Sequence, residues 1–132
     1  MYLLDTNVLS ELARPRPNLK TLAWVEALES IAISAITVEE IAFGIARAQP
    51  ARRVKLAVWF DKIFESVDVH DVTQAIARAS AELRAARAVA GRPVAQADML
   101  IAATALIHGL TLATRNVGDF ADCGVTLFDP FI

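Results

Sequence analysis

Short apolar runs alternate along this chain with longer segments in which apolar residues recur at helical spacing. The runs have the length and the bulky apolar composition of buried strands. They predict five strands, over residues 2–4, 31–34, 67–69, 111–114 and 125–128. Because these strands alternate with helical segments, the pattern indicates an α/β fold with a parallel sheet and helices on both faces.

Helix signals lie between the predicted strands. Asn18 is a suitable N-cap, Asp71 is another, Pro50 ends a helix, and Gly91 and Gly109 close the two longest ones. The predicted helices cover residues 7–13, 18–29, 37–48, 52–64, 71–91 and 98–109, with a turn or short helix over 116–120. No repeat, linker or low-complexity segment interrupts the pattern, which predicts a single domain over residues 1–132.

The composition is that of a folded protein, with 55% hydrophobic and 21% charged residues. The longest uncharged apolar stretch, residues 99–112, is too short and too interrupted to span a bilayer. Asp5 stands where a signal peptide would need its apolar core. Cys123 is the one cysteine, which excludes an internal disulfide, and we interpret it as a small buried hydrophobe. These features predict a cytoplasmic protein that does not contact a membrane.

The net charge of −2 gives no support to nucleic-acid binding by itself. A nucleic-acid substrate would require that a metal mask the acids and that basic residues cluster locally. The candidate basic residues are Arg14, Arg16, Arg47, Arg52, Arg53 and Lys55. Scattered surface arginines are the more common explanation of such a set.

Four acids follow strands or open helices, and each has an ordinary explanation. Asp5 is a possible N-cap of the helix that follows the first strand. Glu40 matches the third position of a capping box that begins at Thr37. Asp98 lies in the first turn of its helix, where the helix dipole favours an anion. Asp119 is a possible solvated turn residue.

Taken together, Asp5, Glu40, Asp98 and Asp119 indicate a different role, because the carboxyl ends of parallel strands meet at one edge of the sheet. Carboxylates gathered there raise one another's pKa values or require a cation. Oxygen ligands suit Mg²⁺ or Mn²⁺, and no His or Cys cluster indicates zinc. Polar neighbours positioned to hydrogen-bond the carboxylates or metal-bound water are Thr6, Asn7, Thr114 and Asn116. We interpret the two histidines, His70 and His108, as structural.

The sequence resembles the PIN-domain ribonucleases, specifically the VapC toxins of bacterial toxin–antitoxin pairs and the similar FitB proteins. Four blocks in order carry the resemblance: LLDTNVLSE at 3–11, SAITVEEI at 34–41, ADMLIAATA at 97–105 and LATRNVGDF at 112–120. It implies a PIN-domain fold with a twisted parallel sheet in the order 3-2-1-4-5. It also implies core acids at Asp5, Glu40 and Asp98, with Glu40 selected over Glu39.

The fourth acid departs from the family pattern, which has an acid or amide at position 116 and often a further acid at 119. Here Asp119 alone carries charge, and Asn116 would orient a ligand or a water molecule. The resemblance further implies a Mg²⁺-dependent endoribonuclease toxin that leaves 5′-phosphate and 3′-hydroxyl ends and forms a homodimer. Its partner would be a small DNA-binding antitoxin that blocks the acidic pocket and tethers the pair to operator DNA. The exposed faces of the helices at 7–13 and 37–63 are the expected antitoxin contacts.

In this interpretation Asp5 and Asp98 hold the metal directly, Glu40 acts through water or as a base, and Asp119 completes the site. One alternative is a PIN module that binds an antitoxin without cutting RNA. Another is a phosphate-accepting α/β domain that uses Asp5. A receiver would need a late lysine, yet no lysine follows Lys62, and a dehalogenase-like phosphatase would need an acid at position 7, which is asparagine.

Overall fold

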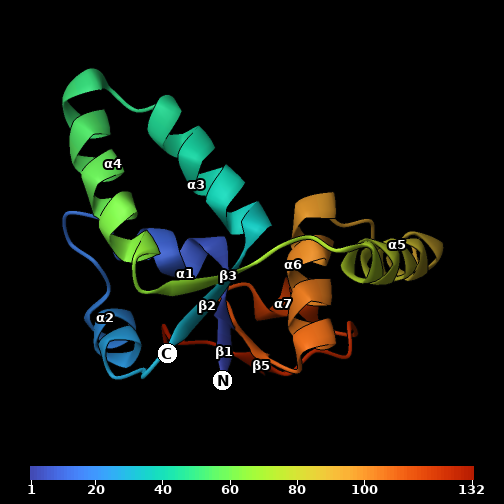
Figure 1. Cartoon of the computed structure of the whole chain (residues 1–132). Helices are drawn as coiled ribbons and strands as arrows, with labels where there is room; N and C mark the ends of the chain where they lie inside the picture. Colours follow the sequence, from blue (N-terminus) through green and yellow to red (C-terminus); the bar gives the residue numbers. More distant parts are fainter.

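The apolar run at the start of the chain forms β1 (Tyr2–Leu4), the central strand of a five-stranded sheet. The computed structural model describes residues 1–132. Its other strands are β2 (Ile31–Ser34), β3 (Val67–His70), β4 (Thr111–Ala113) and β5 (Leu127–Phe128). All pairings are parallel and the order is β3-β2-β1-β4-β5, which confirms the predicted α/β fold and strand order (Figure 1).

The strand order makes the space between β1 and β4 the switch point of the sheet. From β1 the chain adds β2 and β3 on one side, and it then crosses to the other side to add β4 and β5. In a parallel sheet of this order, the helices that follow the two strands at the switch point lie on opposite faces, and a crevice is expected outside the carboxyl ends of these strands. In open α/β sheets, ligands bind in that crevice.

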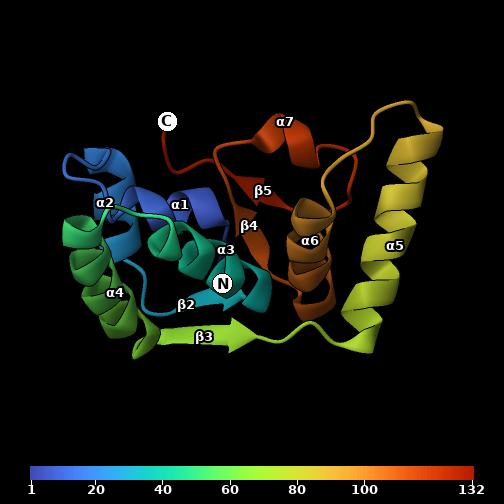
Figure 2. The same ribbon diagram turned by 90° about the horizontal axis from the view of Figure 1, so that it is seen from above.

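Seven helices cover the two faces of the sheet. They are α1 (Thr6–Glu11), α2 (Leu19–Glu26), α3 (Ala35–Ala46), α4 (Pro50–Phe64), α5 (Gln74–Val89), α6 (Gln96–His108) and α7 (Val117–Phe120). Figure 2 shows α1 to α4 gathered on one side of the molecule, and α6 on the other with α5 outermost. None of the helices combines the length and apolar composition that a membrane crossing requires.

Two apolar cores hold the helices to the sheet, because successive side chains of a strand point to opposite faces. Leu4 packs in one core with Val8 of α1, Ile41 of α3 and Phe60 of α4. Leu3, its neighbour in β1, packs in the other core with residues of α6 and α7. Each fully buried aliphatic side chain of this kind contributes about 1.5–3 kcal/mol to folding.

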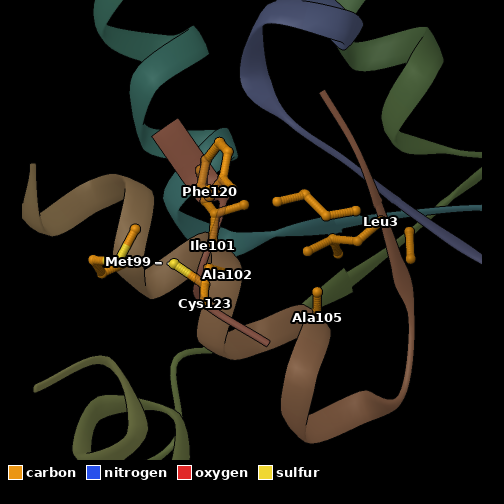
Figure 3. Packing of buried hydrophobic residues seen from close by; sticks show 9 residues of the cluster. Leu3, Met99, Ile101, Ala102, Ala105, Phe120 and Cys123 are labelled. Carbon is orange, nitrogen blue, oxygen red and sulfur yellow. Dashed lines mark hydrogen bonds between the residues drawn. The ribbon is translucent and has the colours of Figure 1, made fainter. Parts of the chain in front are cut away.

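The second core surrounds the uncharged part of α6 (Figure 3). Met99, Ala102 and Ala105 of that helix belong to one apolar cluster with Phe120 and Cys123 from the C-terminal part of the chain. Cys123 is 5% exposed, and its Sγ lies 3.8 Å from Sδ of Met99. The interpretation of Cys123 as a small buried hydrophobe is confirmed.

The predicted capping box at the start of α3 is wrong. Ser34 is the N-cap, and its hydroxyl accepts a hydrogen bond from N–H of Ile36 at 3.0 Å. The helix therefore begins directly at the end of β2, with no connecting loop. Thr37 is fully buried inside its first turn, and Glu40 lies beyond the third helical position. Both side chains are free for other contacts.

Several other predicted boundaries are shifted by a few residues. Asp5 caps α1, so that helix starts at Thr6, one residue early. Pro50 opens α4 instead of only ending α3, because its fixed backbone angle suits a first helical turn. Thr73, and not Asp71, caps α5 through a bond from N–H of Ile76. The predicted N-cap at Asn18 is confirmed.

The remaining shifts occur at the ends of helices and strands. Helix α6 begins at Gln96, two residues before Asp98, and ends as predicted at Gly109, whose left-handed backbone closes it. Strand β4 ends at Ala113, and β5 spans only Leu127–Phe128. Thr114 directly follows β4, and its N–H still donates to the carbonyl of Phe128 at 2.9 Å.

Candidate metal centre

Asp5 lies at the carboxyl end of the central strand and is 4% exposed. Its Oδ1 accepts from N–H of Thr6 at 2.7 Å, and its Oδ2 accepts from Oγ1 of Thr114 at 2.8 Å. Burial raises the pKa of the Asp5 carboxyl, the two hydrogen bonds oppose that rise, and the charges of Glu40 and Asp119 add to it. Asp5 is thus a helix cap and a buried anion in the crevice at once.

Thr114 is oriented by the turn that follows β4. N–H of Asn116 donates to Oγ1 of Thr114 at 3.0 Å, and the threonine proton is then directed to Asp5. This relay joins the ends of β1 and β4 across the switch point. The side chain of Asn116 is exposed and makes no capping bond, so its contribution here comes from its backbone.

Glu40 faces the crevice from α3. Oγ1 of Thr6 donates to Oε1 of Glu40 at 2.6 Å and lies 3.0 Å from the hydroxyl of buried Thr37. Glu39 is exposed, whereas Glu40 is partly buried. The two threonines therefore hold Glu40 beside the N-terminal end of α1, next to the N-cap Asp5.

Asp98 lies in the first turn of α6, directly before the fully buried Met99. Burial, together with repulsion from the other three acids, raises the pKa of Asp98 from 3.8 to about 6. No hydrogen bond to the Asp98 carboxylate offsets this rise. An ionised Asp98 is therefore an unrelieved negative charge in this crevice.

Asp119 belongs to α7 and is the exposed member of the set. Its charge acts on both Asp5 and Asp98, so it stands at the rim of the same crevice. Its main chain is held by Arg87 of α5, whose Nη2 donates to the carbonyl of Asp119 at 2.5 Å. Nη1 of Arg87 donates to the carbonyl of Ala121.

The four predicted acids thus act on one another electrostatically at the switch point, and their oxygens are the donors that a hard divalent cation prefers. No three acidic, histidine or cysteine side chains are close enough here to hold an ion by direct contact alone. Mg²⁺ usually keeps several waters and is bound through one or two carboxylates. A hydrated ion therefore fits the donor set, and the metal-ligand roles of these residues stay a prediction.

The polar residues named with the acids divide into two groups. Thr6 and Thr114 contact carboxylates directly, whereas Asn7 is exposed and makes no hydrogen bond to an acid. Thr37, expected only as a cap, supports Glu40 through Thr6. The Thr-x-x-Glu spacing could have indicated this role, because residues three apart lie on the same side of a helix. His70 and His108 stack on each other with ring centroids 3.9 Å apart.

Sequence reasoning missed Arg87, which is 7% exposed and joins α5 to the segment that carries Asp119. We expect Arg87→Met to lower the free energy of unfolding by about 2–4 kcal/mol, because two carbonyl groups lose a charged donor. Urea denaturation would measure this loss. Arg84→Met, which removes an exposed arginine from the same helix, is the matched control and should change stability by less than about 0.5 kcal/mol. Equal effects of the two substitutions would contradict the bridging role.

Fold and site together define an α/β domain with a cluster of acids at the switch point of its sheet. The chain belongs to the PIN domain family, which matches residues 2–124. PIN-domain nucleases in general depend on divalent metal.

Similar proteins cover almost the whole chain. Toxin FitB of Neisseria gonorrhoeae is 37% identical over 139 residues, which cover 99% of each protein. The VapC ribonuclease Y4jK of Sinorhizobium fredii is 36% identical and covers 99% of this chain and 98% of its own. The solved structure of FitAB bound to an IR36 DNA fragment superimposes with a TM-score of 0.86 at 35% identity, covering 100% of this chain and 96% of the other.

Proposed function

We propose that this protein is the toxin of a type II toxin–antitoxin pair and acts as a Mg²⁺-dependent endoribonuclease. The observation that carries the proposal is the buried carboxylate of Asp5 with Asp98 and Glu40 around it, at the ligand-binding crevice of the sheet. The likeness to a protein named as a toxin and to one named as a ribonuclease supports the same function.

Each acid has a part that follows from its surroundings. Asp5 and Asp98 hold the cation, because Asp5 is rigidly oriented and Asp98 has an unpaired charge to offer. Glu40, fixed by Thr6, orients the attacking water or accepts its proton. Asp119 completes the site from the rim. When bound, the cation activates water and neutralises the charge that develops on the phosphoryl oxygens.

The expected products carry 5′-phosphate and 3′-hydroxyl ends, as the resemblance to PIN-domain ribonucleases implies. These ends form when water attacks the phosphorus, the P–O3′ bond breaks and the 3′-oxygen leaves as a hydroxyl after it is protonated. The substrate is RNA, following the ribonuclease named among the relatives. The place of action is then the cytoplasm, where RNA is available and where Cys123 stays reduced. Mn²⁺ would replace Mg²⁺ in the same oxygen site.

The partner is a small DNA-binding antitoxin that covers the crevice. A cleft of about 260 Å³ runs between α1, α3 and α4 and includes Glu40, Ile41, Ile45 and Trp59 among its walls. An apolar segment seated there would reach Glu40 and block access to the acids. The solved structure of FitAB bound to a DNA fragment supports a toxin–antitoxin pair that meets DNA. We propose that the toxin is a homodimer and that it meets operator DNA only through its partner.

The test is brief induced expression of the wild type and of Asp5→Asn, followed by sequencing of RNA 5′ ends. We expect growth arrest and new 5′-phosphate ends at a few sites with the wild type, and neither with the variant, because asparagine cannot supply the anionic ligand. Circular dichroism of the purified variant controls for folding. Arrest without new RNA ends would instead support the antitoxin-binding module that does not cut RNA.

A further inference from the structure

A second cleft opens on the other side of α1, away from the apolar cleft beside Glu40. It has a volume of about 430 Å³ and is lined almost entirely by polar side chains. The lining residues are Asn7, Ser10, Glu11, Arg14, Arg115 and Phe131. Ser10 lines both clefts, so the two meet across α1. The function proposed above gives no role to the two arginines and the aromatic ring of this cleft.

The cleft begins beside the acidic crevice. Arg115 directly follows Thr114, whose hydroxyl donates to Asp5, and Asn7 lies two residues after Asp5. A substrate strand with one phosphate at the acids therefore has its neighbouring nucleotide within reach of this cleft. A ligand of this cleft is therefore expected to be the part of the substrate next to the cleaved phosphate.

Arg115 is held in a defined geometry although it is exposed. Its guanidinium carbon lies 4.6 Å from the ring centroid of Phe131. Phe131 is fixed in turn, because its N–H donates to Oδ1 of Asp129 at 2.8 Å and the adjacent carbonyl of Pro130 accepts from Thr21 at 3.2 Å. A guanidinium supported in this way keeps its N–H donors for a phosphate and its outer face for a base.

The other charges of the cleft are already engaged with each other. Glu11 accepts from N–H of Asn18 at 2.8 Å and pairs with Arg14 at 3.2 Å. The backbone bond from Asn18 lowers the pKa of Glu11, burial opposes this, and the charges of Arg14 and, more weakly, Arg115 add to the lowering. Glu11 is therefore a stable anion that occupies Arg14. Two arginines against one glutamate leave a net positive charge, and Arg115 is the cation without a hydrogen-bonded partner.

We propose, on the basis of the ribonuclease function proposed above, that Arg115 supported by Phe131 forms a subsite for single-stranded RNA next to the cleaved phosphodiester. Its N–H groups bind the adjacent phosphate, and its outer face stacks with the adjoining base. The subsite supplies local positive charge that the whole chain, at −2, does not have. A single strand fits because stacking requires an unpaired base.

The experiment measures RNA binding without cleavage. Fluorescence anisotropy would follow a short single-stranded RNA of randomised sequence on Asp98→Asn, alone and combined with Arg115→Gln. We expect Arg115→Gln to weaken binding about tenfold, in the range of losing one stacked base. The slope of log affinity against log salt should also fall by about 0.7, the value for one phosphate contact with a single strand. Arg84→Gln, an exposed arginine of α5, is the matched control and should change neither value.

Two further variants separate the subsite from a general charge effect. Arg115→Lys keeps the charge and should retain most of the salt slope while losing affinity, because an ammonium does not stack as guanidinium does. Phe131→Leu should weaken binding, and its effect should largely disappear in the Arg115→Gln background, because the ring acts through the arginine. Unchanged thermal unfolding of each variant verifies that the fold is intact.

The outcomes distinguish this subsite from the proposed function. If Arg115→Gln and Arg84→Gln bind RNA equally well, the subsite is wrong, whatever the enzyme cleaves. If Arg115→Gln alters only inhibition by a co-expressed antitoxin, the cleft belongs to a protein partner, which also overturns it. Failure of the wild type to cleave any RNA would overturn the ribonuclease itself, independently of these binding data.

Discussion

Asp98→Asn is expected to abolish RNA cleavage and at the same time to stabilise the protein at neutral pH. Loss of a metal-holding carboxylate should lower the cleavage rate at least about 10³-fold, because several kcal/mol of transition-state stabilisation depend on the cation. The variant removes an ionised group that burial and the neighbouring acids disfavour. Active sites often reduce stability for the sake of function, and here the cause is electrostatic.

The sign of the stability effect follows from the pKa of Asp98. Its value rises from 3.8 to about 6 on folding, so the folded state binds the proton more tightly than the unfolded state. The free energy of unfolding of the wild type therefore falls as pH rises between these two values. Asparagine has no proton to lose. After allowance for solvent screening of this half-buried group, Asp98→Asn should be more stable at neutral pH by on the order of 1 kcal/mol.

Urea denaturation across this pH range, without divalent ions, would measure the difference. The gain should disappear at about pH 3, below both pKa values, where Asp98 is protonated in both states. Glu82→Gln, which neutralises an exposed acid on α5, is the control and should affect neither cleavage nor stability by much. Cleavage retained by Asp98→Asn would remove Asp98 from the site, and a stability loss that grows with pH would contradict the electrostatic account.

The acids and the sheet were predictable because their signals are local. The apolar run before Asp5 indicates a buried strand and places a carboxylate at its carboxyl end. In the same way, the run that forms β4 is followed by the polar residue Thr114. Such a signal can be found from sequence, because a residue that directly follows a strand must lie at the carboxyl end of that strand. The strand order itself came from the family resemblance, because alternation indicates parallel strands and does not order them.

The features that sequence could not supply depend on distant segments or on competition between nearby ones. Arg87 meets the Asp119 carbonyl across 32 residues, and nothing in α5 distinguishes it from the exposed Arg84. Thr37 was the predicted cap of α3, whereas the cap in the structure is Ser34. Ser34 caps because β2 ends there, and Thr37, fully buried, supports the site. Arg115 likewise gained significance only when the fold brought Phe131 beneath it.

Mg²⁺ is expected to stabilise the wild-type protein strongly at alkaline pH and weakly at acidic pH. An ion that binds only the folded state raises the free energy of unfolding by about 2.7 kcal/mol when its free concentration is 100 times its Kd. The ion requires ionised carboxylates, and protons compete for Asp98, whose pKa is raised to about 6. The apparent affinity for Mg²⁺ should therefore fall as pH falls through that value.

The measurement is urea denaturation with Mg²⁺ and with EDTA, at about pH 8 and at about pH 5, which bracket the pKa of Asp98. The stability gained from Mg²⁺ should be the larger at the alkaline pH. Asp98→Asn should gain less at the alkaline pH, and its gain should depend less on pH, because the ligand that titrates near pH 6 is gone. This separates a specific site from general screening of acidic repulsion, which Mg²⁺ would also provide at the surface. An equal gain for wild type and Asp98→Asn would assign the effect to screening and leave the acidic crevice without a metal role.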